Sequence, residues 1–226
     1  MTTYFSAEYA YHLHKAGFVS TEQTRYYLQG VCVEKAQTRP GCYLVATDGH
    51  RMGVFYDATA HTDQSGIIVS LNKTGLAACK PGRHDMDGRM VVVEGSTVAI
   101  HDRTAGDAAA SAPSPLAINC GSVIDGTFPD WRRVVPFKPQ TIHAHKSYNP
   151  AYLAAFNFKP FSGATPALTI EQGDHRDPAV VRNTAFPDFL AVLMPMRAAD
   201  PEKTPDIRPG WLNDNPHALP KSEAAE

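Results

Sequence analysis

The feature that most constrains the fold is a short helical segment followed by several short apolar runs, an order that recurs along the chain. Residues 8–16 are typical of a helix, with Ser6 placed to cap its start and Gly17 placed to end it. The apolar runs that follow, and that favour strands, are residues 26–34, 43–56 and 67–70. Turns are expected at residues 39–41 and at the Asp48-Gly49 pair. This first unit therefore consists of a strand, a helix and three strands.

A second unit with the same order follows. Its expected elements are a helix at residues 72–79, a hairpin at 90–94 and 97–101, a loop at 104–115 and a strand at 116–120. Gly95-Ser96 is a strong two-residue hairpin signal, and Pro81-Gly82 bounds the helix. Residues 128–139 are typical of a linker to the next unit.

A third unit begins after this linker. Its expected elements are a strand at residues 141–145, a helix at 148–158 and strands at 168–171, 179–182 and 189–194. Pro150 suits the first position of the helix. From residue 198 the chain is rich in proline and charge, which predicts a flexible or surface-hugging tail. Three such units indicate an α+β fold with antiparallel sheets and helices on one face.

Composition excludes several classes of protein. The 226 residues carry a formal net charge of -2, so any contact with DNA requires a locally basic surface on a near-neutral body. No apolar run approaches the roughly 20 residues needed to cross a bilayer, and the N-terminus lacks the pattern of a signal peptide. We therefore expect a cytoplasmic protein with no membrane partner.

Residues capable of metal binding or catalysis occur without the spacing that either chemistry requires. The four cysteines (Cys32, Cys42, Cys79 and Cys120) form no Cys-x-x-Cys pair, which favours free buried thiols over a zinc site. The histidine pairs are His12/His14, His84-Asp85, His101-Asp102 and His143/His145. His143 and His145 could share a metal on one strand face, but exposed strand positions are the favoured interpretation. No nucleophile motif, phosphate loop or dinucleotide motif occurs. We expect no cofactor, no metal and no enzymatic activity.

Four segments carry a more specific signal. They are residues 24–31 (Thr-Arg-Tyr-Tyr-Leu-Gln-Gly-Val), 46–52 (Ala-Thr-Asp-Gly-His-Arg-Met), 125–136 (Asp-Gly-Thr-Phe-Pro-Asp-Trp-Arg-Arg-Val-Val-Pro) and 192–197 (Val-Leu-Met-Pro-Met-Arg). Together and in this order they resemble the signature segments of the bacterial replicative sliding clamp, the β subunit of DNA polymerase III. The resemblance runs from Ser6 to Pro136 and from Asn149 to Arg197.

The resemblance implies a clamp-like domain organisation. Clamp chains have three similar domains of two units each, and two chains close into a ring around DNA. Residues 1–136 match the middle domain, residues 137–197 match the second half of the final domain, and residues 198–226 form the proline-rich tail. The first domain and the first half of the last have no counterpart here. Three units per chain would need four chains to supply the twelve units of a ring, so a closed ring, a monomer and an open dimer all remain open.

The resemblance also implies a pocket for short linear motifs of polymerases and clamp loaders. By motif, its residues are Leu28, Thr47, Gly49, His50, Arg51, Met52, Pro129, Arg133, Val134, Val192, Met194, Pro195, Met196 and Arg197. Methionine and valine suit an adaptable apolar floor, and Gly49 would allow close approach of a peptide backbone. His50, Arg51 and Arg133 would orient polar groups of the peptide. Read alone, Met194 and Met196 are typical of a core strand and Arg133 of a solvated surface; only the joint occurrence favours a pocket.

Contact with double-stranded DNA is a weaker expectation. Its candidates are Lys15, Tyr26, Tyr27, Lys73, Lys80 and Lys159, with His12 and His14 beside the first. Burial in the sheet is the favoured interpretation of the two tyrosines, although aromatic rings also stack on bases. Binding would be independent of DNA sequence and sensitive to salt.

Two functions fit these expectations. The first is a clamp-like processivity factor for DNA replication that binds linear motifs and encircles DNA, with homo-oligomerisation. The alternative is a ringless, clamp-derived module that sequesters such motifs. The tail, which includes Trp211 and Leu212, could also fold back over the pocket as an intramolecular competitor, although a disordered extension is the favoured interpretation.

Overall fold

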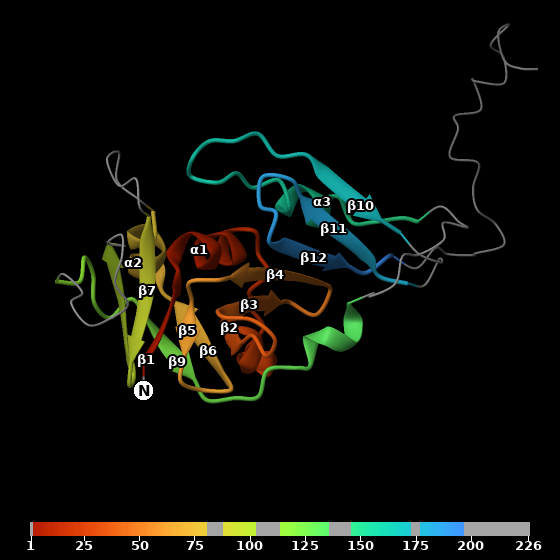
Figure 1. Ribbon diagram of the computed structural model, residues 1–226. Helices are drawn as coiled ribbons and strands as arrows, with labels where there is room; N and C mark the ends of the chain where they lie inside the picture. Colours follow the sequence, from red (N-terminus) through yellow and green to blue (C-terminus); the bar gives the residue numbers. More distant parts are fainter. Residues whose placement is uncertain (1, 81–87, 103–113, 136–145, 173–176, 197–226) are drawn as a thin grey trace, which may run out of the picture.

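The computed structural model describes residues 2–80, 88–102, 114–135, 146–172 and 177–196. Within these residues two antiparallel sheets and a few short helices form the α+β architecture expected from the sequence (Figure 1). The strand expected at 141–145, most of the loop at 104–115, and the tail with its suggested return to the pocket lie outside the described residues. No helix among them is long and apolar enough to cross a membrane.

The larger sheet has eight strands. In spatial order they are β10 (Leu168–Glu171), β11 (Ala179–Asn183), β12 (Phe189–Leu193), β4 (Arg51–Asp57), β3 (Cys42–Thr47), β2 (Val31–Lys35), β6 (Gly66–Leu71) and β9 (Gly121–Ile124). Each neighbouring pair is antiparallel. The pairing of β12 with β4 joins the third unit to the first, with Phe189 opposite Phe55 and Val192 opposite Met52. This β4–β12 seam brings together segments that are more than a hundred residues apart in sequence.

The smaller sheet has four strands and combines the first and second units. In spatial order they are β5 (His61–Thr62), β1 (Thr2–Ser6), β7 (Arg89–Glu94) and β8 (Thr97–Asp102). The hairpin expected between β7 and β8 is confirmed, and Gly95 adopts a φ of +60°, which glycine allows at little strain. Strands of the first unit pair with strands of the second unit in both sheets, which joins the two units.

Each described α-helix starts at a polar cap. The helices are α1 (Ala7–Lys15), α2 (Lys73–Ala78) and α3 (Pro150–Ala155), and their caps are Ser6, Asn72 and Asn149. Each cap side chain accepts a hydrogen bond from a backbone N–H of the first turn, which satisfies a donor that the helix itself leaves unpaired. The three helices expected from the sequence are therefore present, α3 being shorter than predicted.

Side chains alternate between the two faces of the larger sheet, so its apolar residues form two clusters, one on each face. Leu44 and Phe55 face the main core, which also receives the apolar faces of α1, α2 and α3. The other face carries a smaller group, the outer cluster, which consists of Cys32, Val45, Met52, Val54, Ile68 and Val192. Tyr27, Phe128, Trp131 and Val135 pack against it. The α-helices therefore cover one face of the sheet, and the connecting segment at residues 126–135 crosses the other.

Two strand predictions were wrong in placement. Residues 23–28 form a 3-10 helix, η1 (Gln23–Leu28), and β2 starts only at Val31. The aromatic residues Tyr26 and Tyr27 favour a strand locally, but both lie against Gly126 of the connecting segment, a tertiary contact that local propensity does not report.

The strand expected at 116–120 is instead β9, which begins at Gly121. Residues 117–120 follow the edge of β8 through backbone hydrogen bonds to Ile100 and Val98. Asn119 then turns the chain with a φ of +55°, and its carbonyl accepts a hydrogen bond from the Asn72 side chain. Gly121 fits against β6 because a β-carbon there would lie 1.9 Å from the Ser70 carbonyl oxygen.

Candidate peptide-binding site

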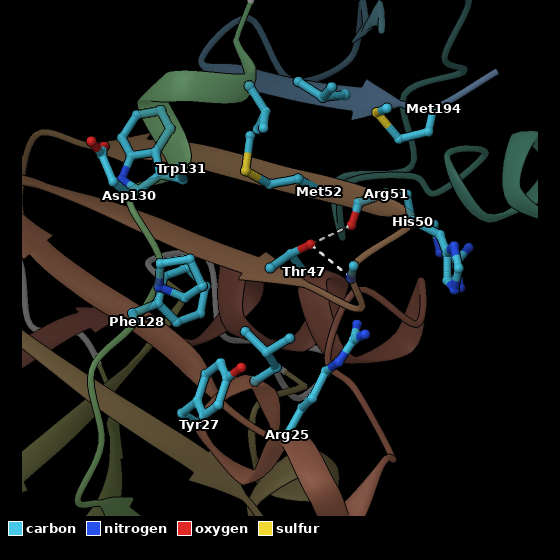
Figure 2. A pocket seen from close by; sticks show the side chains of 15 residues that line it. Arg25, Tyr27, Thr47, His50, Arg51, Met52, Phe128, Asp130, Trp131 and Met194 are labelled. Atoms are coloured by element: carbon cyan, nitrogen blue, oxygen red, sulfur yellow. Dashed lines mark hydrogen bonds between the residues drawn. The ribbon is translucent and has the colours of Figure 1, made fainter.

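An apolar pocket of about 270 Å³ lies on the outer face of the larger sheet, beside the β4–β12 seam. Figure 2 shows its lining side chains around Met52, with Trp131 and Phe128 on one side and Met194 and His50 on the other. The lining residues are Arg25, Tyr27, Leu28, Thr47, Gly49, His50, Arg51, Met52, Phe128, Pro129, Asp130, Trp131, Val134, Val192 and Met194. All four sequence segments singled out above contribute to it.

The floor of the pocket is built by the seam. Met52 and Val192 are 3% and 2% exposed and lie opposite each other on β4 and β12. Leu28 is also buried, whereas Met194 and Val134 at the rim are 43% and 45% exposed. A buried floor with exposed apolar side chains at the rim is the arrangement expected of a site that takes apolar ligand groups.

A tight turn between β3 and β4 forms one wall. The Thr47 hydroxyl donates to the Arg51 carbonyl at 2.8 Å and accepts from the Gly49 N–H at 3.1 Å, as Figure 2 shows. The Asp48 carboxylate accepts from the N–H groups of His50 and Arg51 at 2.9 and 3.0 Å. Gly49 adopts a φ of +89°, so the tight turn expected at Asp48-Gly49 depends on glycine.

The Arg51 side chain is held within the protein. Its Nε donates to Asp48 at 3.0 Å and its Nη2 donates to the Gly17 carbonyl at 2.9 Å. Its guanidinium carbon also lies 4.6 Å from the centre of the Tyr152 ring. Arg51 therefore ties the wall of the pocket to the chain just after α1 and to α3; its expected role of orienting a ligand stays a prediction. His50 stacks on the same ring, with 6.1 Å between ring centres.

Arg25 and Tyr27 line the pocket although neither was assigned to it from the sequence. A β-carbon on Gly49 would lie 2.7 Å from Nη1 of Arg25, so the guanidinium rests directly on the turn. Arg25 pairs only loosely with Glu22, at 3.6 Å, and its side chain is 48% exposed. Both residues belong to the segment at residues 24–31, which is one of the four described above. They were not assigned to the pocket because a strand was expected there, whereas η1 turns their side chains towards the pocket.

The connecting segment forms the remaining wall and is anchored at one carboxylate. Glu34 on β2 accepts from the Trp131 indole N–H at 3.0 Å and from Arg132 at 2.7 Å. Phe128 and Trp131 pack against the outer cluster beneath. Of this wall the sequence had indicated Pro129 and Val134; Phe128, Asp130 and Trp131 were missed, although the same motif contains them.

Three predicted pocket residues that the structure describes are not among the lining residues. The Arg133 side chain is 84% exposed and pairs with Asp130 at 3.0 Å. Pro195 and Met196 continue beyond the rim, where the Met196 N–H donates to the Ser147 carbonyl at 2.8 Å. Arg197 lies outside the described residues. Of the thirteen predicted residues that the structure describes, ten therefore line the pocket.

The residues proposed to contact DNA do not share one surface. Lys15, Lys73 and Lys80 are exposed on or beside α1 and α2, and Lys159 is exposed just after α3. Lys80 also lies 5.4 Å from the centre of the Tyr11 ring. Tyr27, by contrast, packs on the opposite face of the sheet against the outer cluster, and Tyr26 is 52% exposed beside it. The lysines and the tyrosines therefore lie on different faces of the larger sheet, and their contact with DNA stays a prediction.

Little other chemistry is evident in the described part of the chain, which contains no group of three or more metal-ligating side chains. The four cysteines are free and buried, and burial raises the pKa of the Cys32 and Cys79 thiols to about 12, so both stay protonated. His84-Asp85, His143 and His145 lie outside the described residues. His12 is buried beside Phe158, and burial lowers the pKa of His14 to about 4.

No family model and no curated protein matches the chain in sequence. Solved structures match it in fold. A sliding clamp from Bartonella birtlesii bound to griselimycin has a TM-score of 0.59 at 19% identity, over 87% of this chain and 66% of the clamp chain. The Caulobacter crescentus β sliding clamp, with polyethylene glycol bound to a putative β-motif tethering region, has 0.56 at 22%, over 87% and 65%. The Pseudomonas aeruginosa clamp has 0.59 at 17%, over 88% and 66%. The chain therefore has the fold of DNA polymerase III β sliding clamps over about two thirds of a clamp chain's length.

Proposed function

We propose that this protein is a non-enzymatic, clamp-like accessory factor of DNA replication. Its pocket captures short linear motifs of polymerases and clamp loaders. The observation that supports this most strongly is convergence: the 47–52 turn, the 126–135 segment and the end of β12 meet in one apolar pocket. The fold shared with sliding clamps, some of them solved with ligands, supports the same assignment.

The lining chemistry supports an apolar ligand. Leu28, Met52, Val192 and Met194 accept apolar side chains, and the flexible methionines adapt to more than one sequence. A volume of about 270 Å³ suits two or three large apolar side chains rather than a whole folded partner. Short peptides with closely spaced leucine and phenylalanine residues therefore fit best.

The domain organisation proposed from the sequence suits this role. Residues 1–136 would act as a middle clamp domain and residues 137–197 as half of a final domain, so that the pocket lies at their junction.

Exposed lysines on the helix side, including Lys15 and Lys73, would face DNA inside an assembly of several chains. Replacing both with glutamate should weaken salt-sensitive binding to a 30-base-pair duplex and leave peptide capture unchanged. Native mass spectrometry at micromolar concentration should show a closed oligomer; a stable monomer would contradict encirclement.

Peptide capture tests the proposal directly. A fluorescein-labelled six-residue peptide with two leucines and one phenylalanine should bind the full chain with a saturable rise in polarisation. Met194→Lys places a charge at the apolar rim and should weaken binding at least tenfold. Ile118→Lys changes a side chain that is 58% exposed and does not line the pocket, so it should leave binding unchanged. Equal affinities of all three proteins would contradict the proposed function.

A further inference from the structure

A strip of three aromatic rings, with a guanidinium group at each end, leads away from the wall of the pocket over the outer face of β3 and β4. We call it the arginine–aromatic strip; it consists of Arg39, Tyr43, Tyr56, Trp131 and Arg132. Trp131 belongs both to the pocket lining and to the strip. The two surfaces are therefore continuous.

The rings and cations of the strip are in contact throughout. The Tyr43 ring centre lies 5.5 Å from that of Trp131 and 5.6 Å from that of Tyr56, its cross-strand partner. The Arg39 guanidinium carbon lies 4.3 Å from the Tyr56 ring centre and 6.0 Å from that of Tyr43. At the other end the Arg132 guanidinium lies 4.3 Å from the Trp131 ring. These contacts order two long cationic side chains on a half-exposed aromatic surface.

The two arginines differ in charge balance. Arg132 is neutralised by Glu34, whose carboxylate lies 2.7 Å away. Arg39 is exposed and forms no ion pair with any described carboxylate; its Nη2 reaches only the Tyr43 hydroxyl, at 3.4 Å. The end of the strip farthest from the pocket therefore carries an uncompensated positive charge.

We propose that the strip is an extension of the peptide site that selects partners with an acidic flank beside the apolar motif. This inference rests on the proposed function and adds to it a specificity determinant, Arg39. Through the Tyr43 ring the Arg39 guanidinium lies within roughly 12 Å of the Trp131 ring, a distance that an extended peptide covers in about four residues. The flank packs on the tyrosine rings, and its aspartate or glutamate pairs with Arg39.

Peptide fits this strip better than nucleic acid does. The Glu34 carboxylate lies within it, and nucleic acid binding depends on several cations that neutralise successive phosphates. The strip also lies on the opposite face of the sheet from the exposed lysines of α1 and α2. One acidic side chain next to an aromatic contact matches one uncompensated guanidinium.

Peptides with charged flanks test the proposal on the full chain. The probes are the six-residue leucine–phenylalanine peptide and versions with a four-residue extension, at either end, that contains two aspartates or two lysines. One aspartate-extended peptide should bind about two- to fivefold more tightly than the core peptide, the range of an exposed ion pair. Arg39→Ala should abolish this gain without changing the affinity of the core peptide, and Arg39→Lys should retain part of it. Arg39→Glu should transfer the gain to the lysine-extended peptide.

Each contrary outcome identifies what fails. A gain that persists in Arg39→Ala, or no gain in the unmodified protein, overturns the extension while the pocket stands. Absence of binding by the core peptide overturns the pocket and the extension with it. The proposal is also overturned if oligothymidylate displaces the labelled aspartate-extended peptide at a lower concentration than the unlabelled peptide does, and if this displacement requires Arg39. That result reassigns the strip to single-stranded DNA.

Discussion

Met52 on β4 lies directly opposite Val192 on β12, and this pair joins the first unit to the third while forming the floor of the pocket. Stability and the proposed ligand binding therefore depend on the same pair of residues. Met52→Ala removes most of a side chain that is 3% exposed, and should lower the free energy of unfolding by about 2–5 kcal/mol. Met52→Leu nearly conserves volume and should lower it by less than about 1.5 kcal/mol. Urea denaturation followed by circular dichroism measures both; equal losses for the two variants would show that the floor is not tightly packed.

Met194 and Met196 look equivalent in sequence but differ in their position relative to the rim of the pocket. Met194 lines the pocket and Met196 does not, although they are 43% and 54% exposed. Met194→Glu should weaken binding of the apolar peptide at least tenfold, because a carboxylate would have to be desolvated against the ligand. Met196→Glu should change affinity by less than about twofold, because the new carboxylate stays in water. If the two variants lose affinity equally, the pocket extends beyond the described rim.

The turn wall offers a test of glycine geometry. Gly49 and Gly95 both have positive φ, +89° and +60°, so alanine at either position should lower stability by about 1–2 kcal/mol. Only at Gly49 does the new β-carbon meet a side chain, Nη1 of Arg25 at 2.7 Å; Gly95 has open space. Gly49→Ala should therefore displace Arg25 and alter peptide affinity, while Gly95→Ala leaves affinity unchanged. Thermal denaturation and polarisation titration measure the two effects separately.

Much of the fold was predictable because local signals and tertiary structure agree. Ser6, Asn72 and Asn149 cap the helices at the places where the sequence indicated their starts. The Gly95-Ser96 turn lies between strands that pair in the expected hairpin. In each case the interaction that fixes the element lies within a few residues of it.

The errors arose where contacts distant in sequence decide local structure. Tyr26 and Tyr27 favour a strand, yet they pack against Gly126 and leave η1 in place of a strand. Arg51 could be assigned to the pocket wall by motif, but its hydrogen bond to the Gly17 carbonyl joins residues 34 positions apart and has no local signal. Arg25 has no local signal that separates it from a solvated cation. Motif resemblance thus indicated most of the residues that line the pocket, and packing determined which side chains face it.

The anchor of the connecting segment should be measurable through its tryptophan. Glu34→Ala removes the hydrogen-bond acceptor of both Trp131 and Arg132, and should lower the free energy of unfolding by about 1–2 kcal/mol. The loss stays this small because solvent screens the ion pair with Arg132, which is partly exposed. The chain has two tryptophans, so a Trp211→Phe background isolates the emission of Trp131. In that background Glu34→Ala should shift Trp131 emission to the red and weaken peptide binding. An unchanged spectrum would show that packing on the outer cluster alone holds the segment.

The partly buried His14 should make stability depend on pH. Burial lowers its pKa in the folded protein to about 4 from the ordinary value of 6.5, and its Nε2 has no hydrogen-bond partner among the described residues. The unfolded chain therefore binds a proton at higher pH than the folded chain does. The stabilisation is fully present above pH 6.5 and is lost as the pH falls to about 4, by an amount on the order of 2 kcal/mol. His14→Gln should remove this part of the pH dependence, whereas the matched change His61→Gln on an exposed histidine should retain it. Urea midpoints recorded between pH 7 and 4 provide the measurement, and parallel curves for the unmodified protein and His14→Gln would rule out the effect.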